Sequence, residues 1–314
     1  MSTAPNRVGI ISSLTKTAVP KQESITGDAA ANSGTGEVAG KGSRLWEIAS
    51  LLALAIWLYF SIVNRLVAQW FHDPNFSHGF FVPFFSAYVV WKSRDRLFAL
   101  PETPSSWGFV FLVFSMLMLI VGALGAELFL SRISLIFLIA SLIILFWGWA
   151  RFRVLLFPTA FLFLMVPIPA LVFNQITFPL QLLASKVAAV ALPFAGVPVL
   201  REGNIIHLPA MPLEVAEACS GIRSLLSLVT MAIIYGFFRE SRNWIRVILA
   251  LLAVPIAIAA NSTRIVGTGL LVQYWDPDKA EGFFHSFSSW LVFALSLGML
   301  LLSHQIFRRR PKVR

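Results

Sequence analysis

The 314-residue sequence has very little cysteine and very little charge. Cys219 is its one cysteine, and only 13% of its residues are charged. A single cysteine cannot form a disulfide within the chain, so the fold does not rely on an oxidising compartment. A soluble domain of this length carries about twice this charged fraction. An ordinary soluble globular domain is therefore excluded.

Several sequence motifs are absent as well. The sequence contains no glycine-rich phosphate loop, no internal repeat and no aromatic–basic pattern typical of nucleic-acid binding. We therefore expect neither a cofactor nor a nucleic-acid partner. Met1–Arg44 lacks the continuous apolar core of a signal peptide and is rich in Ser, Thr, Gly and Ala. Residues 1–44 are predicted to be a disordered cytoplasmic tail.

Long apolar runs dominate the rest of the chain, in which 57% of all residues are hydrophobic. A helix of about 20 apolar residues crosses about 30 Å of hydrocarbon. The sequence predicts an all-α, polytopic membrane protein of about eight transmembrane helices, with residues 45–308 as the membrane domain. The predicted spans are Trp46–Leu66, Phe76–Trp91, Trp107–Ala126, Ile133–Ala150, Val154–Phe173, Gly221–Phe238, Trp244–Val266 and Phe284–Phe307.

The positive charges orient these spans. The net charge is +10, which retention of Lys and Arg in cytoplasmic loops explains without a nucleic-acid partner. With eight crossings, every basic cluster lies on one side, predicted to be the cytoplasm together with both termini, including the basic C-terminus at residues 309–314. A ninth crossing at Ile176–Phe194 would move the last two clusters outside. That stretch is therefore predicted to be interfacial or re-entrant at the outer face.

The segment before the sixth span holds the cysteine. Asn204–Leu208 and Leu213–Ala216 are predicted to be short extended pieces that form a hairpin-like turn. Cys219 then stands at the start of a helix, where the helix dipole is expected to lower the thiol pKa. Arg223, one turn later, adds positive potential. The alternative is that Cys219 is a small buried hydrophobe.

Two further polar residues stand at the predicted outer ends of the last two helices. Arg264 lies inside the membrane edge and shares a helix face with Asn261; it either serves a function or extends its charge to the headgroups. His285 is, taken alone, a neutral interfacial histidine. Packing of adjacent helices would bring Cys219, Arg264 and His285 together. A thiol, a base and a fixed cation are the components of an acyl-transfer site.

Other polar residues near this face carry less weight. His72, Asp73 and His78 could suggest a metal site, but no further ligand is evident and no Cys accompanies them, so no metal is expected. His78 is predicted to hydrogen-bond near the mouth of the site. Glu217 could orient His285 or Arg264, or could be a solvated loop charge.

The motif Glu217–Ser224 (EACSGIRS), followed by Asn261–Arg264 (NSTR) and then His285, resembles the exosortase/archaeosortase family of membrane transpeptidases. The stretch Asp73–Gly79 belongs to the same resemblance, which covers roughly residues 46–307. It implies a Cys/Arg/His catalytic site at Cys219, Arg264 and His285, supported by Arg223, Glu217, Asn261 and His78.

The resemblance also implies an activity and a location. The family cleaves a C-terminal sorting signal of exported proteins and passes the acyl-enzyme to an acceptor. Its substrates are PEP-CTERM-like: a short motif, a transmembrane helix and a basic tail. The expected location is the bacterial inner membrane, in contact with lipid, with the active site on the outer side.

A non-enzymatic function is the alternative, namely a transporter or scaffold for exopolysaccharide export. Transporters normally carry polar groups or broken helices near the membrane midplane, often in repeated halves. In this sequence the midplane portions are apolar and the polar groups gather at one edge. The pattern favours the enzyme.

Overall fold

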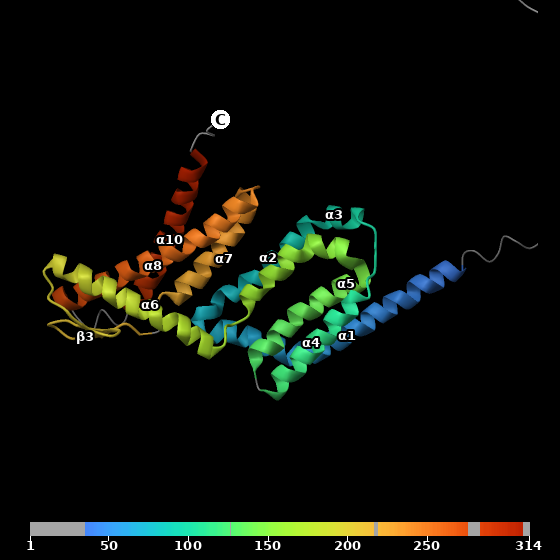
Figure 1. The fold of residues 1–314 in the computed structure, drawn as a ribbon, viewed down its shortest axis with the longest axis horizontal. Helices are drawn as coiled ribbons and strands as arrows, with labels where there is room; N and C mark the ends of the chain where they lie inside the picture. Colours follow the sequence, from blue (N-terminus) through green and yellow to red (C-terminus); the bar gives the residue numbers. More distant parts are fainter. Residues whose placement is uncertain (1–34, 126, 217–218, 276–282, 310–314) are drawn as a thin grey trace, which may run out of the picture. The chain divides into compact units, whose positions relative to one another are not determined.

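The computed structural model describes residues 35–125, 127–216, 219–275 and 283–309. It forms two compact units, Met1–Trp57 and Leu58–Arg314. The second unit holds every described element except the first part of α1 (Figure 1). The α-helices are α1 (Thr35–His72), α2 (Phe81–Lys92), α3 (Arg94–Ala99), α4 (Trp107–Leu124), α5 (Leu128–Phe161), α6 (Ala170–Ala191), α7 (Ile222–Arg239), α8 (Asn243–Tyr274) and α10 (Phe283–Arg309). The 3-10 helices are η1 (Pro74–Phe80), η2 (Leu162–Met165) and η3 (Leu192–Ala195).

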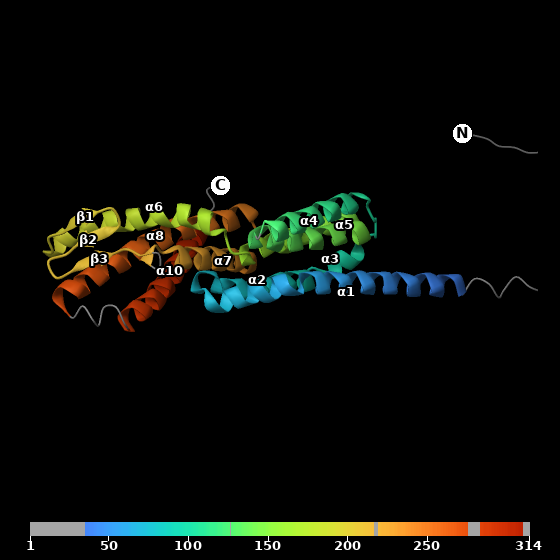
Figure 2. The same cartoon turned by 90° about the horizontal axis from the view of Figure 1, so that it is seen from below.

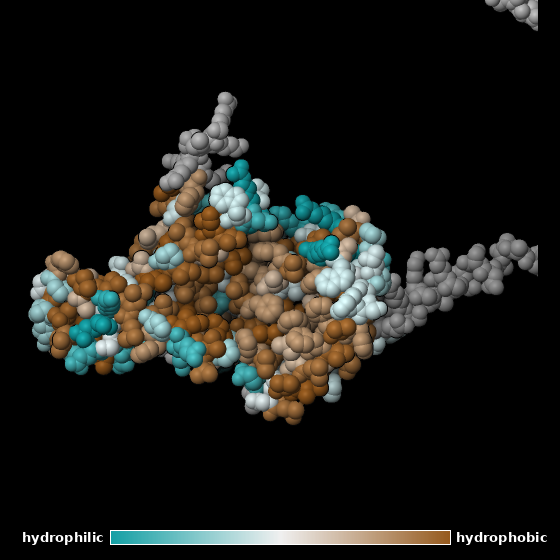
Figure 3. Space-filling model, in the orientation of Figure 1, coloured by the Kyte–Doolittle hydropathy of each residue, from teal (hydrophilic) through white to brown (hydrophobic). Residues whose placement is uncertain are grey.

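Seven helical stretches of the described chain are long and apolar enough to cross a membrane. They are Ala49–His72, Trp107–Leu124, Leu128–Met165, Ala170–Ala195, Ile222–Arg239, Asn243–Tyr274 and Trp290–Phe307. Apolar residues cover most of the visible face in Figure 3, as lipid contact requires. The prediction of an all-α, polytopic membrane protein is confirmed. The predicted tail was residues 1–44. Residues 1–34 of it lie outside the described residues, whereas residues 35–44 are helical, because α1 begins at Thr35.

Three of the predicted spans differ in the structure. Phe76–Trp91 is divided between η1 and α2, and α2 has only 12 residues. Ile133–Ala150 and the first part of Val154–Phe173 run together in α5, where Gly148 has a non-helical backbone (φ 81, ψ 179). A side chain at position 148 would collide with the backbone of Thr103. Glycine therefore allows the chain to change direction within α5 (Figure 1).

The predicted hairpin is present, with one strand more than expected. Strands β1 (Leu200–Glu202), β2 (Ile205–His207) and β3 (Pro212–Glu214) form an antiparallel sheet in the order β1-β2-β3. Gly203, at φ 62, makes the turn between β1 and β2. Because β3 ends at Glu214, the sheet delivers the chain directly to the cysteine.

Helix α6 contains the stretch that was predicted to be interfacial. Ala184 and Ala188, on one face of α6, pack against the sheet and against Ile265 of α8. Figure 2 shows α6 beside the sheet and α8. Another face exposes apolar residues: Ile176, Leu183, Val187 and Val190. By length and composition α6 could also cross a membrane, so its interfacial position stays a prediction.

Helices α7, α8 and α10 form a separate core around Leu228, Leu249 and Leu300. A buried polar chain joins α10 to the end of α7. His304 Nδ1 lies 2.8 Å from the Tyr235 hydroxyl, and its Nε2 lies 2.7 Å from the Glu240 carboxylate. His304 is only 1% exposed. This chain fixes one end of α10 against α7.

The predicted orientation can be tested by reporter fusions. Fusions after Arg96 and Arg242 should report the cytoplasm, since basic loops are retained there. An insertion at Gly203, in the exposed β1–β2 turn, should report the outside. Paired phosphatase and fluorescence reporters make the measurement, with matched expression as the control. An external signal after Arg242 would mean that α6 crosses the membrane.

Candidate functional site

Cys219 lies in the short connection between β3 and α7, and it is half-buried. Its amide donates a hydrogen bond to the carbonyl of Ala216 at 2.9 Å. Its own carbonyl accepts a hydrogen bond from the side-chain amide of Asn261 at 2.8 Å. The second bond ties the connection to α8, so the position of the thiol depends on a helix that is distant in sequence.

Gly221 stands at the start of α7, and only a glycine fits there, for two reasons. Its φ of 83 lies in the left-handed region, which glycine adopts without steric cost. A Cβ at this position would also lie 2.7 Å from Cγ of Asn261. The Ser220 hydroxyl accepts a hydrogen bond from the amide of Ile222 at 3.3 Å. The sequence Ser-Gly-Ile therefore turns the chain sharply from Cys219 into α7.

Helix α8 brings Asn261 and Arg264 to the same place. They are three residues apart, so they share a helix face as predicted, and they are 3% and 8% exposed respectively. The positive charge of Arg264 acts on the Cys219 thiol and favours its ionised form. The structure therefore brings Cys219, Asn261 and Arg264 together from elements that the sequence separates.

The pKa of Cys219 is raised above its ordinary value of 9.0, because burial disfavours the thiolate. The charge of Arg264 opposes this shift without reversing it. The expected lowering by a helix terminus and Arg223 is not found. Cys219 precedes α7 rather than lying in its first turn, and Arg223 is not among the causes of the shift. The thiol is therefore predominantly protonated at neutral pH.

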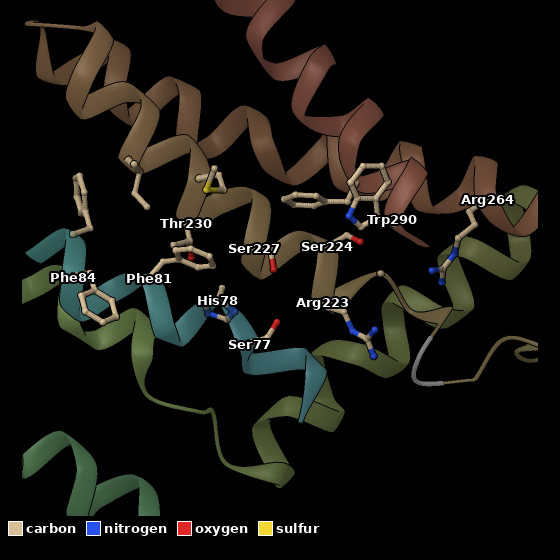
Figure 4. Close-up of a pocket in the computed structure, with 15 residues that line it drawn as sticks. Ser77, His78, Phe81, Phe84, Arg223, Ser224, Ser227, Thr230, Arg264 and Trp290 are labelled. Carbon is tan, nitrogen blue, oxygen red and sulfur yellow. The ribbon is translucent and has the colours of Figure 1, made fainter. Parts of the chain in front are cut away.

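A cavity of about 810 Å³ begins at Gly221, two residues after Cys219, and follows α7. Arg223 and Arg264 stand at one end of it, and Phe84 lies at the other (Figure 4). The lining residues are Ser77, His78, Phe81, Phe84, Phe85, Gly221, Arg223, Ser224, Ser227, Thr230, Met231, Ile234, Arg264, Trp290 and Phe293. Of the α7 residues in this set, sequence reasoning singled out Arg223 and missed those that follow it. The signal was present, because Ser224, Ser227 and Thr230 recur every three residues in an otherwise apolar helix.

His78 lies on the wall of the cavity, and its predicted role near the mouth of the site stays a prediction. Its Nε2–H donates to the carbonyl of Leu164 at 3.1 Å. Burial lowers the pKa of His78 below its ordinary 6.5, so the ring is neutral. His72 instead contacts the carbonyl of Ala68 in its own helix. Among the described residues, no three His, Cys, Asp or Glu side chains are grouped so as to hold a metal ion.

Two predicted site residues cannot be placed at the level of side chains. Glu217 lies outside the described residues, and so does the side chain of His285. The backbone of His285 belongs to the first turn of α10. Further along α10, Trp290 and Phe293 line the cavity. The pairing of His285 with Cys219 stays a prediction.

Comparison with known protein families gives a match. Residues 70–302 match the family described as "Transmembrane exosortase (Exosortase_EpsH)". No curated protein and no solved structure matches the chain. The matched range contains α2 to α8, the sheet, Cys219, Arg264 and most of α10.

The raised pKa of Cys219 predicts the pH dependence of its alkylation. Labelling by iodoacetamide should accelerate as the pH rises toward and through 9.0, because the thiolate is the reactive form. Arg264→Gln should shift this profile to higher pH, since it removes the charge that favours the thiolate. Arg223→Gln is the matched control and should leave the profile in place. A larger shift in the Arg223 variant would contradict this electrostatic assignment.

Proposed function

Because the chain belongs to the transmembrane exosortase family, in general a family of membrane peptidases and transpeptidases, we propose that it is a cysteine transpeptidase. Its substrates are exported proteins that end in a short PEP-like motif, a transmembrane helix and a basic tail. It cleaves them at the outer face of the bacterial inner membrane. The observation that carries the proposal is the buried Arg264 acting on the Cys219 thiol at the end of a cavity.

The reaction begins with attack of Cys219 Sγ on the scissile carbonyl. A thioester forms as the peptide C–N bond breaks, and the leaving amine takes up a proton. Because burial keeps the thiol protonated at neutral pH, attack requires a base at the moment of reaction. His285 is the residue proposed for this proton transfer: it accepts the thiol proton and returns it to the amine. An acceptor nucleophile then resolves the thioester.

Arg264 stabilises the negative charge that develops on the carbonyl oxygen. A guanidinium presents several N–H donors in a fixed plane, and its effect is strongest where water is excluded. Arg264 meets this condition, since it is 8% exposed. Asn261 has a positioning role, because its hydrogen bond holds the backbone of Cys219.

The polar groups at this end of the cavity also bear on the alternative of a transporter or scaffold. The vestibule of an export channel would need charged groups, but it would not need a thiol such as Cys219 beside a buried arginine such as Arg264. The activity of Cys219 variants therefore separates the two functions directly.

The first test concerns the nucleophile. Cys219→Ala should abolish processing of a co-expressed candidate substrate, because no other thiol is present in the chain. Cys219→Ser should restore little, since a hydroxyl ionises far less readily than a thiol. Mass analysis of the new C-terminus of the substrate is the measurement. Immunoblotting of membranes controls for insertion. Processing by the alanine variant at the normal rate would exclude the proposed chemistry.

The second test separates the two arginines. Arg264→Lys should slow cleavage by about 10² to 10³-fold, the usual effect of losing one oxyanion donor, and Arg264→Ala should slow it further. Arg223→Lys keeps a positive charge at the mouth of the cavity and should be milder. The cleavage rate of one substrate is compared across all three variants. The opposite ranking would show that the roles of the arginines are reversed.

A further inference from the structure

The cavity beside α7 is a groove with two aromatic walls. Phe81 and Phe84, on α2, form one wall, and Trp290 and Phe293, on α10, form the other (Figure 4). Phe81, Phe84 and Trp290 are 65%, 75% and 72% exposed. Since α7 is a membrane span by length and composition, these exposed rings lie where lipid or another transmembrane segment would contact them.

The floor of the groove consists of small side chains of α7. Ser224, Ser227 and Thr230 are three residues apart and therefore follow one side of the helix. Such residues allow a second helix to approach closely, and they are enriched at helix–helix contacts in membranes.

The hydroxyls on this floor are not equivalent. The Thr230 hydroxyl donates to the carbonyl of Leu226 at 2.9 Å, within its own helix. The hydroxyls of Ser224 and Ser227 have no hydrogen-bond partner among the residues that the structure describes. A free hydroxyl at membrane depth gains from a partner on a neighbouring helix, whereas an acyl chain offers none.

The charged side chains that line this end of the groove, among the described residues, are both positive. Arg223 and Arg264 both line this end. Arg223 is half-buried and has no acidic partner in the described part of the chain. A ligand that fills the groove therefore needs an apolar length and an anionic group at the end next to Cys219.

We propose that the groove binds the transmembrane helix of the substrate, which enters sideways from the membrane. This inference rests on the proposed function and adds the binding surface. The substrate helix packs against Ser224 and Ser227 between the aromatic walls. Arg223 pairs with an acidic side chain at the start of that helix, which fixes the register and places the preceding peptide bond at Cys219. A phospholipid, with acyl chains in the groove and its phosphate at Arg223, is the competing occupant.

Photo-crosslinking tests occupancy without requiring turnover. p-Benzoylphenylalanine is placed at Met231, on the groove floor, in the Cys219→Ala chain, and for comparison at Ile248, an exposed residue of α8 outside the groove. The probe is a soluble domain followed by one Glu, a Leu/Ala helix of about 20 residues and a Lys tail. Position 231 should capture the probe and position 248 should not. Changing the probe Glu to Lys should reduce capture, and Arg223→Glu should restore it.

A matched pair of serine variants tests the same surface in the active chain. Ser227→Leu fills the floor and should reduce cleavage of a limiting substrate about tenfold, equivalent to about 1.4 kcal/mol of binding. Excess substrate should restore the rate. Ser303→Leu makes the same change on α10 outside the groove and should have no effect. An unchanged rate of Cys219 alkylation shows that both variants are folded.

The outcomes separate the groove from the chemistry. Capture of the probe at position 231 of the Cys219→Ala chain, together with no cleavage of the substrate by the active chain, supports the groove and overturns the proposed enzyme. Cleavage with no capture, and with Ser227→Leu equal to Ser303→Leu, overturns the groove and leaves the enzyme standing. Capture of phospholipid alone at position 231 overturns the groove in favour of a lipid site.

Discussion

The hydrogen bond from the Asn261 side chain to the carbonyl of Cys219 is the contact on which the arrangement of the site depends. A bond of this kind contributes only about 1 kcal/mol, but it joins two elements that the chain itself does not hold together. Its geometry is possible only because residue 221 has no side chain. Arg264, on the same face of α8, is thereby held where its charge acts on the thiol. The Asn261–Cys219 hydrogen bond and the missing side chain at Gly221 therefore hold Cys219 and Arg264 near each other.

The thiol environment represents a compromise between two effects. Burial excludes water, which strengthens the interaction between Arg264 and a developing anion. The same burial makes the resting thiolate unfavourable. A pocket of this kind is inert toward stray electrophiles and becomes reactive when a base and a carbonyl are both in place. Under the proposed function, Cys219 therefore combines low background reactivity with a site prepared for charge that appears during the reaction.

Local patterns in the sequence predicted the local structure well. Asn261 and Arg264 share a face because three residues make nearly one helical turn, and the extended pieces around Pro209–Pro212 are paired strands. Features set by packing were harder to predict. The reversal at Gly148 depends on Thr103, which lies 45 positions earlier in the chain. The raised pKa of Cys219 depends on burial by other helices, which no motif encodes. The groove arises from α2, α7 and α10 together, so no pattern within one helix shows that Ser227 and Thr230 face a cavity.

The polar chain from Tyr235 through His304 to Glu240 has a consequence for biosynthesis. Helices α7 and α8 are translated before α10, so the nucleophile and Arg264 reach the membrane ahead of the helix that supplies Trp290 and Phe293. Only when α10 inserts can His304 reach Tyr235 and Glu240 and fix the second wall of the groove. A nascent chain that has not yet inserted α10 holds a cysteine and an arginine without a place for a substrate helix. Completion of the groove thus coincides with the insertion of α10, so under the proposed function a partly synthesised chain lacks one wall against which a substrate helix would pack.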